Sequence, residues 1–123
     1  MTGPVVDTTS GRLQGFTNTE HNNIHIFMGI PYAMPPVGER RFRPPEPYVP
    51  DNGDSVRECF TASKAAPQTQ MPFDTLMSVQ IDQDNQSEDC LYLNIWTPTI
   101  NPEAKRPVLF WIHTGACMRY FIH

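Results

Sequence analysis

Hydrophobic and polar positions alternate in short runs separated by proline and glycine, a pattern typical of short strands joined by turns. Two runs near the start, residues 5–9 and 12–16, flank Ser10-Gly11, a pair typical of hairpin turns. They predict a β-hairpin. Residues 24–30 alternate loosely as far as Pro31, and they predict a further strand that ends there.

The middle of the chain is less regular. Residues 31–50 contain repeated prolines and Gly38, which exclude regular helix and predict a long, extended surface loop. Residues 51–87 are polar and weakly patterned. A short helix in this region would place four apolar side chains on one face: Phe73, Leu76, Met77 and Ile81.

Two more strands are predicted in the last third. A strand over residues 91–96 would carry bulky side chains on both faces, with Leu91, Leu93 and Ile95 on one and Tyr92, Asn94 and Trp96 on the other. We therefore expect both faces to be covered. Val108 to Ile112 is a continuous apolar run, which is typical of a strand buried on both sides.

Composition bounds the class of protein. A chain of 123 residues is one domain at most, and its 13 prolines are about twice the average share, which fits many turns. The net charge of −4 disfavours a nucleic-acid partner, and the basic cluster Arg40, Arg41 and Arg43 is flanked by Glu39 and Glu46. No stretch is long and apolar enough for a membrane span.

The first residues and the cysteines indicate the cellular compartment of the protein. Residues 1–7 have neither the basic start nor the apolar centre of a signal peptide, so we expect a cytoplasmic rather than a secreted protein. The three cysteines Cys59, Cys90 and Cys117 leave at least one thiol unpaired, and no two have metal-site spacing. We expect free, mostly buried thiols in a reducing compartment. The sequence does not decide whether Cys59 and Cys90 form a disulfide.

Four blocks of sequence carry a family resemblance. Residues 4–15, residues 27–47 and the run Ser87 to Pro98 (SEDCLYLNIWTP), followed by Trp111-Ile112-His113, resemble in order and spacing the type-B carboxylesterases, which include the cholinesterases. The resemblance implies an α/β class, here the N-terminal portion of an α/β-hydrolase fold: mostly antiparallel strands, long proline-rich loops and an incomplete sheet. Residues 1–123 would be a partial domain, with residues 118–123 as a tail unlike the family.

The resemblance also implies structural roles. Arg41 and Glu88 correspond to a buried ion pair that pins the proline-rich loop to the sheet, and loss of one partner of such a pair costs about 3–5 kcal/mol. Gly29 and Gly38 would occupy backbone positions that need unusual dihedral angles. In secreted members the cysteine matching Cys90 pairs with an upstream cysteine, but Ala66 stands at that position here.

Ester hydrolysis on this fold needs a serine in Gly-x-Ser-x-Gly, a histidine base and an acid. The nearest glycine pair, Gly11 and Gly15, flanks Leu13 instead, so the chain holds no nucleophile. Its four histidines precede the family's catalytic position, and we expect His21 and His25 to be exposed loop or strand-edge residues. The resemblance implies no metal and no cofactor. Residues 67–89 contain no Trp for choline recognition, so a choline-specific enzyme is disfavoured.

The oxyanion loop is present in altered form as His113-Thr114-Gly115-Ala116-Cys117. By position, the backbone N–H groups of Gly115 and Ala116 would stabilise the developing oxyanion, a contact worth roughly 2.7–4 kcal/mol per donor. Thr114 replaces the family's first glycine and would be strained by about 1–3 kcal/mol if that position needs a positive φ.

The sequence thus predicts part of a carboxylic ester hydrolase that acts on small-molecule esters through an acyl-enzyme, with this chain inactive alone. Loss of similarity after Cys117 suggests a frameshift, a mis-called intron boundary or a truncated gene model. A non-catalytic esterase-like binding or adhesion module and a non-functional product of a broken gene are the alternatives. Because most of the covering elements of the fold are missing, we expect the isolated chain to be poorly soluble or to unfold without cooperativity.

Overall fold

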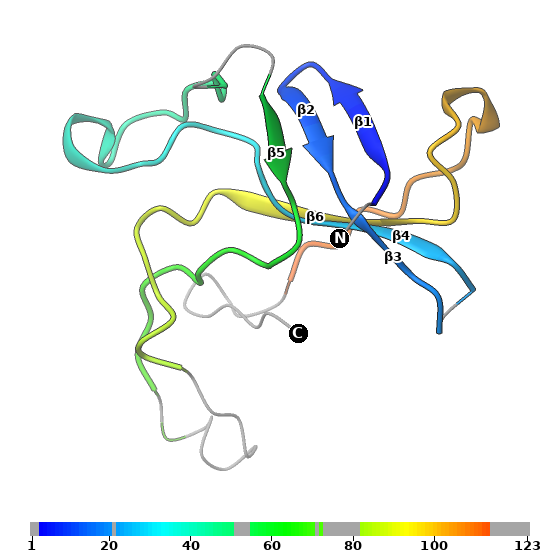
Figure 1. Ribbon diagram of the computed structural model, residues 1–123. Coiled ribbons are helices and arrows are strands. Elements are labelled where there is room, and N and C mark those ends of the chain that lie inside the picture. The colour runs from blue at the N-terminus through cyan, green and yellow to red at the C-terminus, as the bar shows by residue number, and fades with distance from the viewer. Residues whose placement is uncertain (1–2, 21, 51–54, 71, 73–81, 114–123) are drawn as a thin grey trace.

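The computed structural model describes residues 3–20, 22–50, 55–70, 72 and 82–113. Six strands in these ranges form two three-stranded sheets (Figure 1). The first has the order β1-β2-β5, with β1 at Val5–Thr8, β2 at Gly11–Gln14 and β5 at Val56–Glu58. The second has the order β3-β4-β6, with β3 at Phe16–Asn18, β4 at Ile24–Pro31 and β6 at Tyr92–Thr97.

The pairing is mostly antiparallel, as the sequence predicted. Among the described strands, the β1–β2, β3–β4 and β4–β6 pairs are antiparallel and the β2–β5 pair is parallel. The predicted hairpin forms, but its turn is one residue earlier than expected: Thr8 pairs with Gly11, so Thr9 and Ser10 make the turn. Thr8 Oγ1 donates to the Gly11 carbonyl at 2.7 Å, and this bond favours the observed register.

Gly15 lets the chain pass from the first sheet to the second. Its N–H donates to the Pro4 carbonyl at 2.9 Å, while a Cβ at this position would lie 2.3 Å from the carbonyl oxygen of Ile26. Only a residue without a side chain permits this close approach of backbones. β3 therefore starts directly after β2 and belongs to the other sheet.

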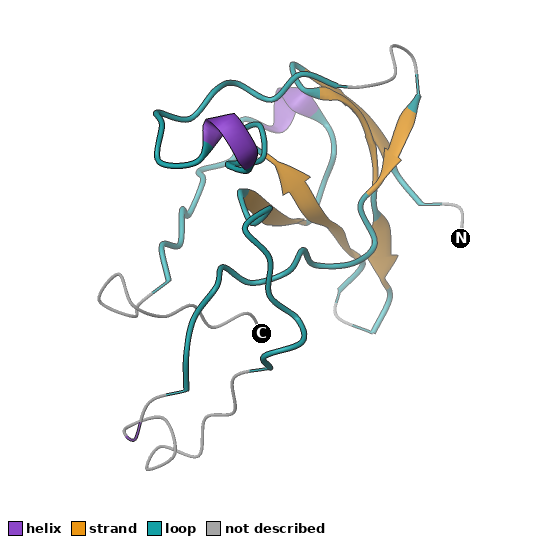
Figure 2. Ribbon diagram, turned by 90° about the vertical axis from the view of Figure 1, so that its left-hand side faces the viewer, coloured by secondary structure: helices purple, strands orange, loops and turns teal. Residues whose placement is uncertain are grey.

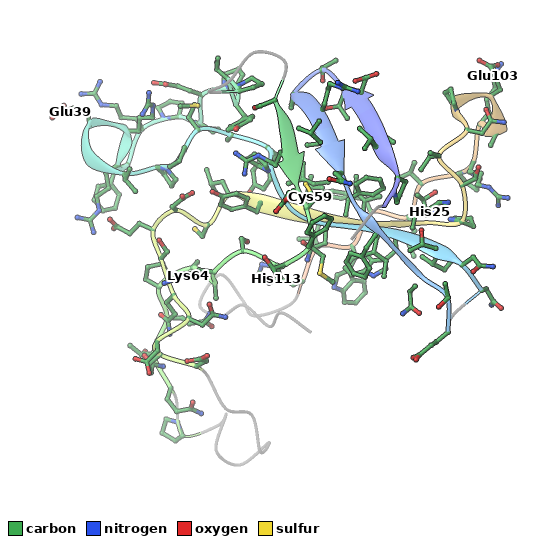
Figure 3. All side chains as sticks on the ribbon, viewed as in Figure 1. His25, Glu39, Cys59, Lys64, Glu103 and His113 are labelled. Atoms are coloured by element: carbon green, nitrogen blue, oxygen red, sulfur yellow. The ribbon has the colours of Figure 1, made fainter. Side chains whose placement is uncertain are left out.

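A small core lies between the two sheets. Leu13 of β2, Phe27 and Ile30 of β4, and Cys59 just after β5 are all buried, with Val6 and Leu93 packed against them. Cys59 has 0% of its surface exposed, and Figure 3 shows it at the end of β5, close to β4 and β6. Every strand in the described ranges except β3 contributes to this core or adjoins it, so the core joins the two sheets into one unit.

The long loop after β4 is as irregular as predicted. It contains one turn of 3-10 helix, η1 at Gly38–Arg40, and its backbone returns to β4's end through a bridge between Ala33 and Pro47. Figure 2 shows this loop projecting from the sheets. A second 3-10 turn, η2 at Pro102–Ala104, follows β6 and begins where Asn101 Oδ1 accepts from the Glu103 N–H at 3.0 Å.

Two expectations about burial are wrong. Ile95 and Trp96 of β6 are exposed, since no described element covers that end of the strand. Val108 to Ile112 is neither a strand nor buried: its side chains are 74–92% exposed, and no strand of the described residues pairs with it. A run this apolar becomes a strand only beside a partner, because its backbone groups otherwise bond to water. The helix predicted around Phe73, Leu76, Met77 and Ile81 lies outside the described residues.

No helix in the described ranges is long and apolar enough to cross a membrane.

Candidate functional site

The oxyanion-binding pair predicted from the sequence, Gly115 and Ala116, lies outside the described residues, as does Thr114. The described chain leads up to it through the exposed run Val108 to Ile112 and reaches His113, which is also exposed.

Arg41 and Glu88 are brought together across 47 positions of sequence by the fold. Arg41 Nη2 lies 2.6 Å from Glu88 Oε1, and the two side chains are 55% and 42% exposed. The contact ties the loop after β4 to the segment that leads into β6. The expected burial is not seen in this chain: half of each side chain faces water, so the pair behaves as a partly screened ion pair.

The other arginines of this loop also lie next to carboxylates. Arg40 Nε contacts Glu46 Oε2 at 2.7 Å, and Arg43 Nη2 lies 3.9 Å from Glu39 Oε2. Figure 3 shows Glu39 at the outer tip of the loop. Because every arginine of the cluster has an acidic partner, the loop carries paired charges and no uncompensated basic patch.

A bulge in β4 shapes the junction between the sheets. Met28 and Gly29 together face the single residue Asn94 of β6, so two N–H groups of β4 leave the regular ladder. The Met28 N–H donates to the Cys59 carbonyl at 2.9 Å, and the Gly29 N–H donates to Asn94 Oδ1 at 2.9 Å. The first of these bonds holds the end of β5 against β4, and thus one sheet against the other.

Gly29 and Gly38, where unusual dihedral angles were predicted, have positive φ angles of +67° and +56°. The two positions differ in their surroundings. A Cβ on Gly29 would lie 2.8 Å from the carbonyl oxygen of Thr61, whereas a Cβ on Gly38 would meet nothing within 4 Å. Gly29 is therefore required by packing as well as by backbone conformation.

Cys59 and Cys90 are both free thiols, so the pairing that the sequence left open does not form. Burial raises the pKa of Cys59 above its usual value, although the nearby Arg57 opposes the shift. The pKa of Cys90 is raised by burial first and then by the negative charges of Asp89 and Glu88. Neither thiol is activated as a nucleophile, since both environments favour the protonated form.

An open depression of about 410 Å³ lies beside the bulge, lined in part by Arg57, Ser63, Lys64, Asp89 and Tyr92. Burial and a hydrogen bond with Asp89 raise the pKa of Tyr92 to about 12.

Arg57, which lines the depression, also contacts Tyr48. Its Nη2 donates to Tyr48 Oη at 2.6 Å, and its guanidinium lies 5.3 Å from the Tyr48 ring centroid. The two cationic groups of the lining, Arg57 and Lys64, are matched by the carboxylates of Glu58 and Asp89, and no nucleophile is hydrogen-bonded to a base among these described residues.

The histidines do not form a catalytic group in the described chain. His25 was expected at a strand edge or in a loop, but it lies half-buried on the central strand β4, where Nδ1 is 2.9 Å from Thr17 Oγ1. Thr17 is the cross-strand neighbour of His25, and their hydrogen bond holds the ring against the sheet. His21 lies outside the described residues. Within the described ranges no three His, Cys, Asp or Glu side chains are placed to hold a metal ion.

Comparison with known proteins decides the family. The model of the carboxylesterase family matches residues 2–121, nearly the whole chain. The chain belongs to the carboxylesterase family. Its sequence is 40% identical to the para-nitrobenzyl esterase of Bacillus subtilis over 116 residues, which cover 94% of this chain and 22% of that esterase. It is 35% identical to human neuroligin-2 over 150 residues, covering 94% of this chain and 18% of neuroligin-2.

Solved structures of the carboxylesterase family agree with the fold. The crystal structure of the Geobacillus stearothermophilus carboxylesterase EST55 at pH 6.2 is 44% identical to this chain and superimposes with a TM-score of 0.75. The superposition covers 94% of this chain and 20% of EST55. The two small sheets are therefore an N-terminal portion of an α/β-hydrolase fold, and the chain spans about a fifth of the length of these carboxylesterase relatives.

Sequence reasoning missed two features of this carboxylesterase segment. The first is Asn94, which accepts the bond from Gly29; the available signal was a polar residue between Leu93 and Ile95 in an apolar strand. The second is the contact of Arg57 with Tyr48, for which the sequence offers no signal because the two residues come from an irregular loop and a short strand.

Proposed function

We propose that this chain is the part of a serine-dependent carboxylic ester hydrolase that carries the oxyanion-binding loop, and that the complete enzyme cleaves small-molecule carboxylic esters through an acyl-enzyme. The observation that supports it is the match of residues 2–121 to the carboxylesterase family, together with 40% identity to a bacterial para-nitrobenzyl esterase. Gly115 and Ala116 would donate their backbone N–H groups to the oxyanion.

In this proposal the remaining chemistry would come from residues outside this sequence. The 123 residues contain no Gly-x-Ser-x-Gly, so the attacking hydroxyl and its base would come from the rest of the domain. The described strands contribute the frame: the bulge at Gly29, and the Arg41–Glu88 contact that ties the loop to the segment before β6. Neither metal nor cofactor is part of this proposed mechanism.

The test uses a hybrid esterase, in which residues 4–116 of this chain replace the matched segment of the Bacillus subtilis para-nitrobenzyl esterase. We expect the hybrid esterase to fold, to hydrolyse a para-nitrophenyl ester and to be labelled at a serine by an organophosphate probe. The isolated 123-residue chain should show no turnover and no labelling. A folded hybrid that hydrolyses no ester, or stoichiometric serine labelling of the isolated chain, would contradict the proposal.

Thr114 supplies a sharper variant of the same test. If Thr114 holds a strained backbone in the oxyanion loop, Thr114→Gly in the hybrid esterase should raise kcat and leave KM nearly unchanged, because the donors act on the transition state. An unchanged kcat would mean that the loop tolerates threonine at this position.

A second candidate is a non-catalytic esterase-like module for binding or adhesion, and the observation that favours it is the 35% identity to neuroligin-2. In that case the hybrid esterase would fold yet fail to hydrolyse esters whichever residue stands at position 114. A non-functional product of a broken gene is the third reading, and failure of the hybrid to fold would favour it.

We also propose that the protein works in the cytoplasm. The free thiols of Cys59 and Cys90, and Ala66 at the position where secreted members have a cysteine, support this compartment. Cell fractionation with an antibody against the chain tests it, and recovery in the culture medium would contradict it.

A further inference from the structure

Two segments outside the strands, residues 65–68 and 82–87, are held together as a neck. The Ala65 N–H donates to the Asn85 carbonyl at 3.0 Å, and the Ser87 N–H donates to the Ala65 carbonyl at 2.8 Å. These bonds belong to a parallel bridge between Ala65 and Gln86. Figure 1 shows the two segments side by side, in green and yellow-green. The neck therefore joins the parts of the chain that lie on either side of residues 69–81.

The side chain of Gln86 bonds to both segments of the neck. Its Oε1 accepts a hydrogen bond from the Gln68 N–H at 2.7 Å, 18 positions earlier in the chain. Its Nε2 donates to the Asp82 carbonyl at 3.3 Å, on its own segment. Gln68 in turn donates from Nε2 to the Ala66 carbonyl at 3.2 Å. A single amide group, which has an acceptor and two donor hydrogens, thus links the two segments.

The neck is held in a different way from the two sheets. In the described part of the chain, the hydrophobic core between the sheets includes no residue of the neck. The contacts that hold the neck are hydrogen bonds, and each has a backbone group as one partner. A segment held by a few hydrogen bonds opens at a lower free energy than strands that share an apolar core. We therefore expect the neck to open while the sheets stay folded.

We propose that Gln86 is a clamp that controls this local opening of the neck. When its amide is bonded, the two segments stay together, and when both bonds break, the segments separate. Gln86 acts through backbone groups of the neck, so it is a positioning residue. The group that it positions is Glu88, which directly follows the neck and contacts Arg41 at 2.6 Å. Opening of the neck thus loosens the contact that ties the proline-rich loop to the segment before β6.

Hydrogen–deuterium exchange in the hybrid esterase, followed by mass spectrometry of peptides, tests the clamp. Loss of one hydrogen bond shifts an opening equilibrium roughly two- to tenfold, so in Gln86→Ala the N–H groups of Gln68 and Ser87 should exchange faster by at least that factor. Peptides from β4 and β6 should exchange as in the unmodified hybrid. Unchanged exchange in the neck, or equal acceleration in the neck and in the two strands, would overturn the inference.

Two further variants separate the hydrogen bonds of Gln86 from other effects. Gln86→Met keeps the length of the side chain but has no amide, so its neck should exchange as fast as that of Gln86→Ala. Normal protection in Gln86→Met would show that packing holds the neck and would contradict the clamp. Asp84→Ala is the matched control, since Asp84 is exposed on the same segment, and it should leave exchange unchanged.

An equal acceleration in Asp84→Ala would show that any change in this segment opens the neck, and it would also overturn the inference. The clamp requires a folded domain and not an active one. If the unmodified hybrid esterase folds but hydrolyses no ester, the proposed function fails while exchange still decides whether Gln86 closes the neck.

Discussion

The backbone N–H of Gly29 donates a hydrogen bond of 2.9 Å to Oδ1 of Asn94, a residue 65 positions further along the chain. The bond closes the bulge of β4 from the side of β6, while the preceding N–H, that of Met28, bonds to Cys59. Both donors released by the bulge thus have partners. This arrangement depends on a positive φ at Gly29, which brings the chain close to Thr61.

We expect Gly29→Ala to destabilise the hybrid esterase by more than the roughly 1–2 kcal/mol that a left-handed backbone costs an alanine, because the new Cβ would also displace the carbonyl of Thr61. Gly38→Ala is the matched control, since Gly38 has a similar φ and open space around it. Urea unfolding measures both variants. Equal losses for the two would show that packing against Thr61 contributes nothing.

The Arg41–Glu88 pair should couple weakly. Both side chains are about half exposed. A double-mutant cycle with Arg41→Ala and Glu88→Ala, measured by urea unfolding of the hybrid esterase, should therefore give a coupling free energy of about 0.2–1 kcal/mol. That is well below the cost expected for a buried pair. Arg43 and Glu39, which lie 3.9 Å apart at the loop tip, form the control cycle and should show no measurable coupling. A coupling above about 2 kcal/mol would indicate burial of the Arg41–Glu88 pair in the complete domain.

The two thiols should differ in reactivity. In the folded hybrid esterase iodoacetamide should modify Cys90 before Cys59, because Cys59 is fully buried and Cys90 only partly. Both should react more slowly at neutral pH than the same cysteines in urea, since the fold raises the pKa of each thiol. Mass spectrometry of peptides gives the order. Modification of Cys59 first, without unfolding, would contradict the described core.

Tyr92 should make stability depend on alkaline pH. The fold raises its pKa to about 12 from an ordinary value near 10, so the folded state favours the protonated phenol. The contribution of Tyr92 to the free energy of unfolding is fully present below about pH 10 and is lost as the pH rises towards about 12. Tyr92→Phe should flatten the fall in melting midpoint over this range relative to the unmodified hybrid esterase. Identical pH profiles for the two proteins would exclude the shift.

The local elements were predictable from the sequence because their signals are local. The hairpin of β1 and β2 follows from alternation around a turn, and the irregular loop after β4 follows from its prolines. The positive φ at Gly29 and Gly38 and the partnership of Arg41 with Glu88 came from the family resemblance. Composition alone suggested neither the glycine conformations nor the Arg41–Glu88 contact.

The features that the sequence did not predict depend on which other elements lie next to each segment in the fold. Val108 to Ile112 has the composition of a buried strand, but without a pairing strand it stays exposed. Ile95 and Trp96 pair with β4, but no described element covers their side chains, and His25 lies within the sheet beside Thr17 of the adjacent strand. The oxyanion donors Gly115 and Ala116 remain a prediction from the resemblance.

The position of Cys59 between the sheets has a consequence for how the polypeptide is made. Its N–H bonds to the Gln14 carbonyl and its own carbonyl accepts from Met28, so neither β2 nor β4 is fully bonded until residue 59 has emerged from the ribosome. The hairpin is free to form early, whereas β4 must wait longer still for β6. During translation β4 thus emerges well before its second partner strand and keeps one edge unpaired until β6 has been made.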